Sequence, residues 1–90
     1  MKKDKKGLEK ILKVLANKRR LEILEYLKCS KRAPVGDISG EIDLSFRATS
    51  QHLAILFSAG LVDKDQKSKQ VFYKLSDSYI DIIKQITSSL

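Results

Sequence analysis

The sequence predicts a mainly α-helical domain that carries one small β-hairpin. Apolar residues recur at helical spacing over most of the first 60 positions of the 90-residue chain. Residues 61–75 then alternate as two short strands around a polar turn, and helical spacing returns after residue 76. The predicted order is α-α-α-α-β-β-α, the layout of a winged helix-turn-helix, with residues 1–90 as a single domain.

The first two helices are predicted from apolar stripes. The stripe of the first helix consists of Leu8, Ile11, Leu12 and Leu15. Asn17 is a suitable N-cap for the second helix. The expected apolar face of that helix comprises Leu21, Leu24 and Leu27, with Ile23 beside it. The stretch from Lys28 to Pro34 is interpreted as a loop, because proline suits a helix start and not a helix interior.

A short third helix is predicted over Val35–Ile42, and Ser45 is positioned to cap a fourth. The buried stripe of the fourth helix is centred on Thr49, Leu53 and Leu56. At 100° per residue, the opposite face consists of Arg47, Gln51, Ala54 and Ser58. Gly60 is placed to end this helix, since glycine adopts the left-handed conformation that a C-terminal cap requires.

The hairpin is predicted from a strand beginning at Val62, a turn at Lys67-Ser68-Lys69 and a second strand over Gln70–Leu75. Ser76 or Asp77 is the expected cap of the last helix.

Charge and cysteine content narrow the function classes. Lys and Arg number 18 against 11 acidic residues, and the net charge of +7 favours a polyanionic partner, with a membrane surface as the alternative. The single cysteine, Cys29, excludes an intramolecular disulfide and is expected to be buried as a small hydrophobe. No apolar run reaches membrane-spanning length and no secretory signal is visible, so a cytoplasmic protein is expected. No catalytic motif is present, which argues against an enzyme.

Several segments resemble the ArsR/SmtB family of bacterial and archaeal repressors. They are residues 17–24 (NKRRLEIL), 37–40 (DISG), 50–56 (SQHLAIL), 59–62 (AGLV) and 71–75 (VFYKL). The resemblance implies a homodimer that binds a DNA operator, represses, and is released by a signal. It also implies that the first and last helices form the dimer interface. The interface residues expected from the two amphipathic helices are Leu8, Ile11, Leu12, Leu15, Tyr79, Ile80, Ile83, Ile86 and Leu90.

The chain departs from the family where its members bind metals. The third helix has no cysteine pair, and the last helix contains Asp77 and Asp81 but no histidine. His52 is the only histidine and has no ligand cluster around it in sequence. We therefore expect neither a metal site nor a cofactor. The nature of an effector stays open.

The fourth helix and the hairpin hold the candidate DNA contacts. An α-helix fits the major groove, and residues near its N-terminus reach base edges. The expected base contacts are Phe46, Arg47, Ser50 and Gln51. The expected phosphate contacts are Ser45, His52, Lys64, Lys67 and Lys69. The alternatives are a solvated polar helix face, with Phe46 tucked into the core, and a charged hairpin that only discourages strand aggregation.

Two other functions remain open at this point. A winged helix can serve as a protein-interaction module whose basic surface meets an acidic protein. It can also bind DNA architecturally, without sequence preference. A defined operator sequence would separate the expected regulator from both.

Overall fold

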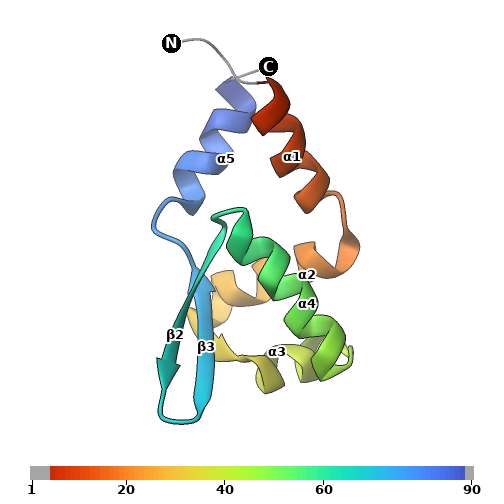
Figure 1. The fold of residues 1–90 in the computed structure, drawn as a ribbon, viewed down its shortest axis with the longest axis vertical. Coiled ribbons are helices and arrows are strands. Elements are labelled where there is room, and N and C mark those ends of the chain that lie inside the picture. Colours follow the sequence, from red (N-terminus) through yellow and green to blue (C-terminus); the bar gives the residue numbers. More distant parts are fainter. Residues whose placement is uncertain (1–4, 89–90) are drawn as a thin grey trace.

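The structure, a computed structural model, describes residues 5–88, which form five α-helices and a three-stranded antiparallel sheet (Figure 1). The helices are α1 (Lys5–Leu15), α2 (Lys18–Ser30), α3 (Val35–Ile42), α4 (Phe46–Ser58) and α5 (Tyr79–Ser88). The strands are β1 (Arg32–Pro34), β2 (Val62–Lys67) and β3 (Gln70–Leu75). The predicted helical architecture, with one hairpin between the fourth and the last helix, is confirmed.

The strand β1 was not predicted, and the interpretation of Lys28–Pro34 as a loop is wrong. Helix α2 continues to Ser30, and β1 then pairs antiparallel with β3, with Ala33 opposite Tyr73. The sheet order is β1-β3-β2, so β1 is an edge strand. Proline is tolerated on an edge, where its missing N–H breaks no ladder. Three residues are too few to show strand periodicity, which is why the sequence pattern missed this element.

The predicted helix caps are observed. The Asn17 side chain accepts a hydrogen bond from the Arg20 backbone N–H at 3.1 Å, and the Ser45 hydroxyl accepts one from Ala48 N–H at 3.1 Å. At the end of α4, Gly60 has φ +79° and donates to the Phe57 carbonyl, while Leu61 N–H donates to the Leu56 carbonyl. This pair of bonds is a Schellman motif, so Gly60 ends the helix as expected.

The core lies between α2, α3, α4 and the sheet. Its fully buried side chains include Ile23, Leu27, Ile38, Leu53, Leu56, Leu61 and Val62. Leu21, which was predicted on the buried face of α2, is instead 51% exposed. The stripe of α2 is centred on Ile23, Leu24 and Leu27, so Leu21 points away from it. Cys29 is exposed, which corrects its expected burial.

The start of α5 also differs from the prediction. The helix begins at Tyr79, and the Ser76 hydroxyl donates to the Gly60 carbonyl at 2.7 Å. This bond ties the end of α4 to the segment that leads into α5. The backbone N–H of Ile82 donates to the Ser78 carbonyl at 2.9 Å, which places the helix boundary at Ser78 and not at Ser76 or Asp77.

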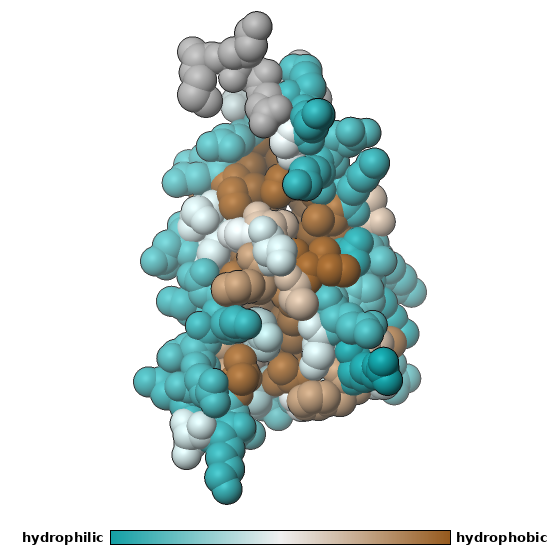
Figure 2. All heavy atoms as spheres, viewed as in Figure 1, coloured by the Kyte–Doolittle hydropathy of each residue, from teal (hydrophilic) through white to brown (hydrophobic). Residues whose placement is uncertain are grey.

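Helices α1 and α5 lie at the end of the molecule opposite the tip of the β2–β3 hairpin (Figure 1). Neither helix contains a buried residue among those described. Leu12 is 40% exposed and Ile80 is 56% exposed. Apolar atoms gather between the two helices, whereas the hairpin is hydrophilic (Figure 2). Both helices therefore present apolar surface that this protomer leaves uncovered.

The residues expected at a dimer interface differ in how far this protomer buries them. Leu15 and Tyr79 pack against the protomer's own core, as Ile82 does. Leu8, Ile11, Ile83 and Ile86 are half-buried. Leu90 lies outside the described residues.

Thr49 gives a stability prediction. It is completely buried, and its hydroxyl has no hydrogen-bond partner among the described residues. Thr49→Val keeps the shape and removes the unsatisfied hydroxyl, so we expect the free energy of unfolding to rise by about 1 kcal/mol. Urea unfolding at a fixed protein concentration measures this. Thr49→Ser, which keeps the hydroxyl and loses the methyl, should be less stable than the wild type. A loss of stability in Thr49→Val would mean that the hydroxyl has a partner.

Candidate nucleic-acid interface

The N-terminal half of α4 exposes a polar face with one aromatic residue. Ser45 caps the helix, and Phe46 is 61% exposed, so the alternative that Phe46 is tucked into the core is wrong. Arg47 and Gln51 are exposed and Ser50 is half-buried. Within the described residues, no carboxylate forms an ion pair with Arg47. The four expected base-contact residues therefore lie in one helical turn and a half, with a free guanidinium among them.

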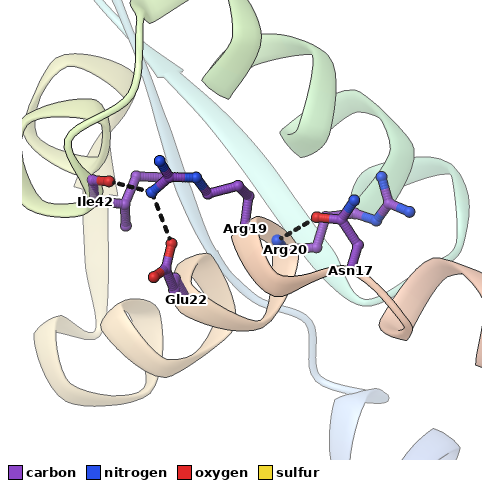
Figure 3. A network of polar contacts seen from close by, with 5 residues as sticks. All are labelled: Asn17, Arg19, Arg20, Glu22 and Ile42. Atoms are coloured by element: carbon purple, nitrogen blue, oxygen red, sulfur yellow. Dashed lines mark hydrogen bonds and ion pairs between the residues drawn. The ribbon is translucent and has the colours of Figure 1, made fainter.

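A side chain of α2 forms a hydrogen bond at the start of the turn that joins α3 to α4. Asp43 has φ 56°, the left-handed conformation that aspartate tolerates better than most residues. Arg19 Nη1 donates to the Ile42 carbonyl at 2.6 Å and also lies 3.0 Å from Glu22 Oε1 (Figure 3). The guanidinium thus satisfies a carbonyl at the end of α3, where the helix itself offers no donor. These bonds tie the end of α3 to α2.

The hairpin forms the wing. Lys67 pairs with Gln70, which leaves Ser68 and Lys69 as a two-residue turn, and Ser68 has φ 60°. The Lys67 ammonium lies 3.7 Å from Asp65 Oδ2, whereas no described carboxylate pairs with Lys69. The wing tip and the N-terminus of α4 lie at the same end of the molecule (Figure 1). Two of the expected sets of contacts therefore lie on elements that reach the same end of the molecule.

Two cations of the wing region stack on aromatic rings. Lys64 Nζ lies 4.6 Å from the centre of the Phe57 ring, and the Arg32 guanidinium lies 4.4 Å from that of Phe72. Phe57 belongs to the last turns of α4, so Lys64 lies away from the helix N-terminus. Lys64 is paired with Tyr73, three positions along β2 from the Lys67–Gln70 pair at the turn, so it also lies away from the wing tip.

His52 lies on the flank of α4 and faces α2. Its Nδ1 is 3.2 Å from Arg20 Nη1. A guanidinium can only donate, so Nδ1 is the acceptor and the neutral ring bears its proton on Nε2. Burial, followed by the charges of Arg20 and Arg19, lowers the pKa of His52 from its ordinary value of 6.5. His52 is therefore neutral at pH 7 and keeps one free N–H donor.

This shift predicts a pH dependence. The folded state holds its proton on His52 less tightly than the unfolded chain, so the stabilisation is complete above pH 6.5 and declines as the pH falls toward the lowered pKa. We expect the free energy of unfolding to decrease over that window, and less so in His52→Gln. His52 is the only histidine, so its ring signals in an NMR titration are unambiguous. A midpoint at or above 6.5 would contradict the account.

The described residues hold no group of three or more His, Cys, Asp or Glu side chains that could bind a metal ion. Of the helices in residues 5–88, none is long and apolar enough to cross a membrane.

Sequence reasoning gave no role to Arg19 or Arg20. A signal was available for Arg20, because it lies three, four and seven positions before Ile23, Leu24 and Leu27. A cation on the buried stripe of a helix needs buried acceptors. Arg20 finds them in the Val14 carbonyl and His52.

Helices α2, α3 and α4 enclose a core together with the sheet. The N-terminus of α4 is capped, polar and exposed, and a basic hairpin follows this helix. These features define a winged helix-turn-helix DNA-binding domain. The family model for "Bacterial regulatory protein, arsR family" matches residues 17–64, more than half of the chain. The chain belongs to the ArsR family of transcription regulators.

Several relatives are similar to this chain in sequence. The chain is similar to the transcriptional activator HlyU of Vibrio cholerae, with 43% identity over 70 residues that cover 78% of this chain and 64% of that protein. It thus spans slightly less than two thirds of HlyU. It is 32% identical to the arsenical resistance operon repressor of Staphylococcus xylosus, covering 89% of this chain and 76% of that protein. Both relatives are named as regulators of transcription.

Solved structures agree in fold. The chain superimposes on HlyU from Vibrio cholerae N16961 with a TM-score of 0.78 and 38% identity, covering 93% of this chain and 92% of that chain. It also matches the homodimeric winged helix-turn-helix DNA-binding domain Mb0332 of Mycobacterium bovis, with a TM-score of 0.77 and 25% identity, covering 92% of this chain and 74% of that chain.

Proposed function

We propose that this chain is a sequence-specific transcriptional repressor that binds an inverted-repeat operator as a homodimer. The observation that carries the proposal is the exposure of Arg47 and Gln51 on the N-terminal half of α4, a helix whose N-terminus lies at the same end of the molecule as the wing tip (Figure 1). A relative named as an activator and relatives named as repressors both exist, and repression is the simpler outcome of occupying an operator.

The base contacts follow from side-chain chemistry. A guanidinium binds guanine O6 and N7 with two hydrogen bonds, and a glutamine amide binds adenine in the same way. Arg47 and Gln51 lie one helical turn apart and supply these groups. The exposed Phe46 ring suits contact with a thymine methyl, and Ser50 completes the reading surface.

The groups proposed to bind phosphates lie on α4, at its N-cap and along the hairpin. The proposed contacts are Ser45, His52 through its Nε2–H, Lys64, Lys67 and Lys69. Such contacts position a protein on DNA and carry no sequence information. Lys69 is expected to be the strongest of them because no described carboxylate competes for it.

Replacing Lys69 tests the role of the wing. Lys69→Ala should weaken binding to all duplexes about equally, and should flatten the plot of log affinity against log salt by about one unit. Lys84→Ala is the matched control, since Lys84 is exposed on α5 and far from the wing. Fluorescence anisotropy over a salt series measures both. Equal slopes for Lys69→Ala and Lys84→Ala would remove the wing tip from the interface.

The dimer is proposed to form through α1 and α5. Both helices show uncovered apolar side chains, and a chain this small buries only roughly 60% of its unfolded surface alone. The homodimeric relative from Mycobacterium bovis supports the formation of a homodimer. The proposed contacts are Leu8, Ile11, Leu12, Leu15, Tyr79, Ile80, Ile83, Ile86 and Leu90.

Selection of bound duplexes from random DNA tests the whole proposal. The expected product is an inverted repeat whose half-sites are centred about one helical turn apart. Retention of duplexes without an enriched sequence would favour the architectural function. Failure to retain any duplex would favour the protein-interaction module.

A further inference from the structure

An apolar groove with a volume of about 620 Å³ lies between helix α1 and helix α4. The groove is lined by Gly7, Lys10, Ile11, Lys13, Val14, Ala54, Ile55, Ser58 and Ala59. Close packing of side chains normally fixes one helix against another. Val14 and Leu15 at the end of α1 pack against the core. The groove leaves little direct packing between α1 and α4, so polar contacts help to set the angle between them.

Arg20 links the two helices through hydrogen bonds. Its Nε donates to the Val14 carbonyl in the last turn of α1 at 2.6 Å. Its Nη1 donates to His52 Nδ1 in the middle of α4 at 3.2 Å. The backbone N–H of Arg20 is in turn held by Asn17, which caps α2. The side chain of Arg20 extends from α2 and therefore contacts both α1 and α4.

The chemistry of both contacts suits a guanidinium. Carbonyls in the last turn of a helix lack intrahelical donors and carry the negative end of the helix dipole, which favours a cation there. The rigid fork of arginine presents its nitrogens at fixed angles, which the single ammonium of lysine cannot reproduce. His52 is kept neutral, so its Nδ1 lone pair stays available as the acceptor.

Arg19 is a natural comparison. Arg19 and Arg20 are neighbours on α2, yet their side chains leave the helix in opposite directions (Figure 3). Arg19 bonds to the end of α3 and to Glu22, and no hydrogen bond links it to α1. Both guanidinium charges act on His52, so they differ in their contacts and not in the sign of their influence.

We propose that Arg20 is a positioning residue that fixes α1 relative to α4, and thereby sets the distance and angle between the two recognition helices of the dimer. The second half of this inference rests on the proposed function, because it requires α1 to lie in the dimer interface. The first half concerns the protomer alone. Arg20 is not one of the proposed DNA contacts.

The first test uses the free protein, without DNA. Residual dipolar couplings of backbone amides report whether α1 and α4 share one alignment. We expect one common alignment in the wild type and in Arg19→Met, and a separate, weaker alignment of α1 in Arg20→Met and Arg20→Lys. Arg20→Lys keeps the charge and the helix propensity, so it stays informative if Arg20→Met unfolds. One shared alignment in a folded Arg20→Lys protein would overturn the proposal.

The second test uses the duplex obtained by selection and a version with one base pair inserted between the half-sites. The insertion moves one half-site by about 3.4 Å and rotates it by about 34°. In the wild type and Arg19→Met, we expect it to weaken binding about tenfold, comparable to a mismatched base pair. In Arg20→Lys the loss should shrink to less than about threefold, because the recognition helices can then move apart.

The outcomes separate the two ideas. A wild type that selects no inverted repeat contradicts the proposed function, while the dipolar couplings still decide the position of α1. A wild type that selects one, together with an unchanged tenfold loss in Arg20→Lys, contradicts only the role of Arg20. A merely structural role would lower affinity for both duplexes equally and leave their ratio unchanged.

Discussion

Replacing Ile80 with aspartate is expected to dissociate the dimer at micromolar concentration without unfolding the protomer. Ile80 is 56% exposed in the protomer and lies in the first turn of α5, where a carboxylate is favoured by the helix dipole. In the dimer, loss of its apolar burial costs about 1 kcal/mol per copy. An unpaired buried carboxylate costs several kcal/mol more. The dissociation constant should therefore rise at least about a hundredfold.

Sedimentation equilibrium measures this effect directly. Ile80→Met, which keeps the volume and the apolar character, should remain dimeric, and Gln85→Asp, on the opposite face of α5, should behave like Ile80→Met. Affinity for an inverted-repeat duplex should fall in parallel with dimerisation, because a monomer occupies only one half-site. An Ile80→Asp protein that stays dimeric would exclude this part of α5 from the interface.

Replacing Arg47 with alanine is expected to remove roughly 1–3 kcal/mol of affinity for the selected operator, between about fivefold and 150-fold. Affinity for unrelated DNA should change much less, because that binding depends on phosphates. Preference at one base position in each half-site should relax, since a bidentate contact reads one guanine. Competitive binding to the operator and to a shuffled duplex gives the ratio that matters.

Arg47→Lys is the sharper variant. It retains the charge, so nonspecific affinity and salt dependence should remain as in the wild type. It loses the two-point fork, so the preference for guanine should fall. An unchanged ratio of specific to nonspecific affinity in both Arg47 variants would mean that α4 does not read the sequence.

Most of the fold could be predicted because local chemistry and tertiary structure agree in it. Helix α4 is the best case: Ser45 caps it, Thr49, Leu53 and Leu56 are buried, and Gly60 ends it. The strand β1 could not be predicted, because its three residues are held by pairing with β3, about forty positions away in sequence. Long-range pairing of this kind leaves no periodic trace in so short a segment.

The candidate site also contains some features that could be predicted from the sequence and others that could not. Exposure of Arg47 and Gln51 follows from helix geometry alone, and the structure agrees. Asp65 and Lys67 lie two positions apart on one strand, so their contact could have been predicted. The environment of Lys64 depends on Phe57, which sequence spacing does not place beside it. The links made by Arg19 and Arg20 likewise depend on carbonyls at the ends of other helices. Side-chain reach across helices is set by packing, and periodicity does not report it.

The central claim is that α4 enters the major groove and reads bases. Intermolecular NOEs between the protein and the selected duplex test it most directly. The account predicts contacts from Phe46, Arg47 and Gln51 to thymine methyl groups and cytosine H5 protons, which lie in the major groove. It also predicts that amide shifts at Lys69 occur without NOEs to bases. A complex in which these α4 residues show no NOEs to DNA, while another face of the protein does, would contradict the account.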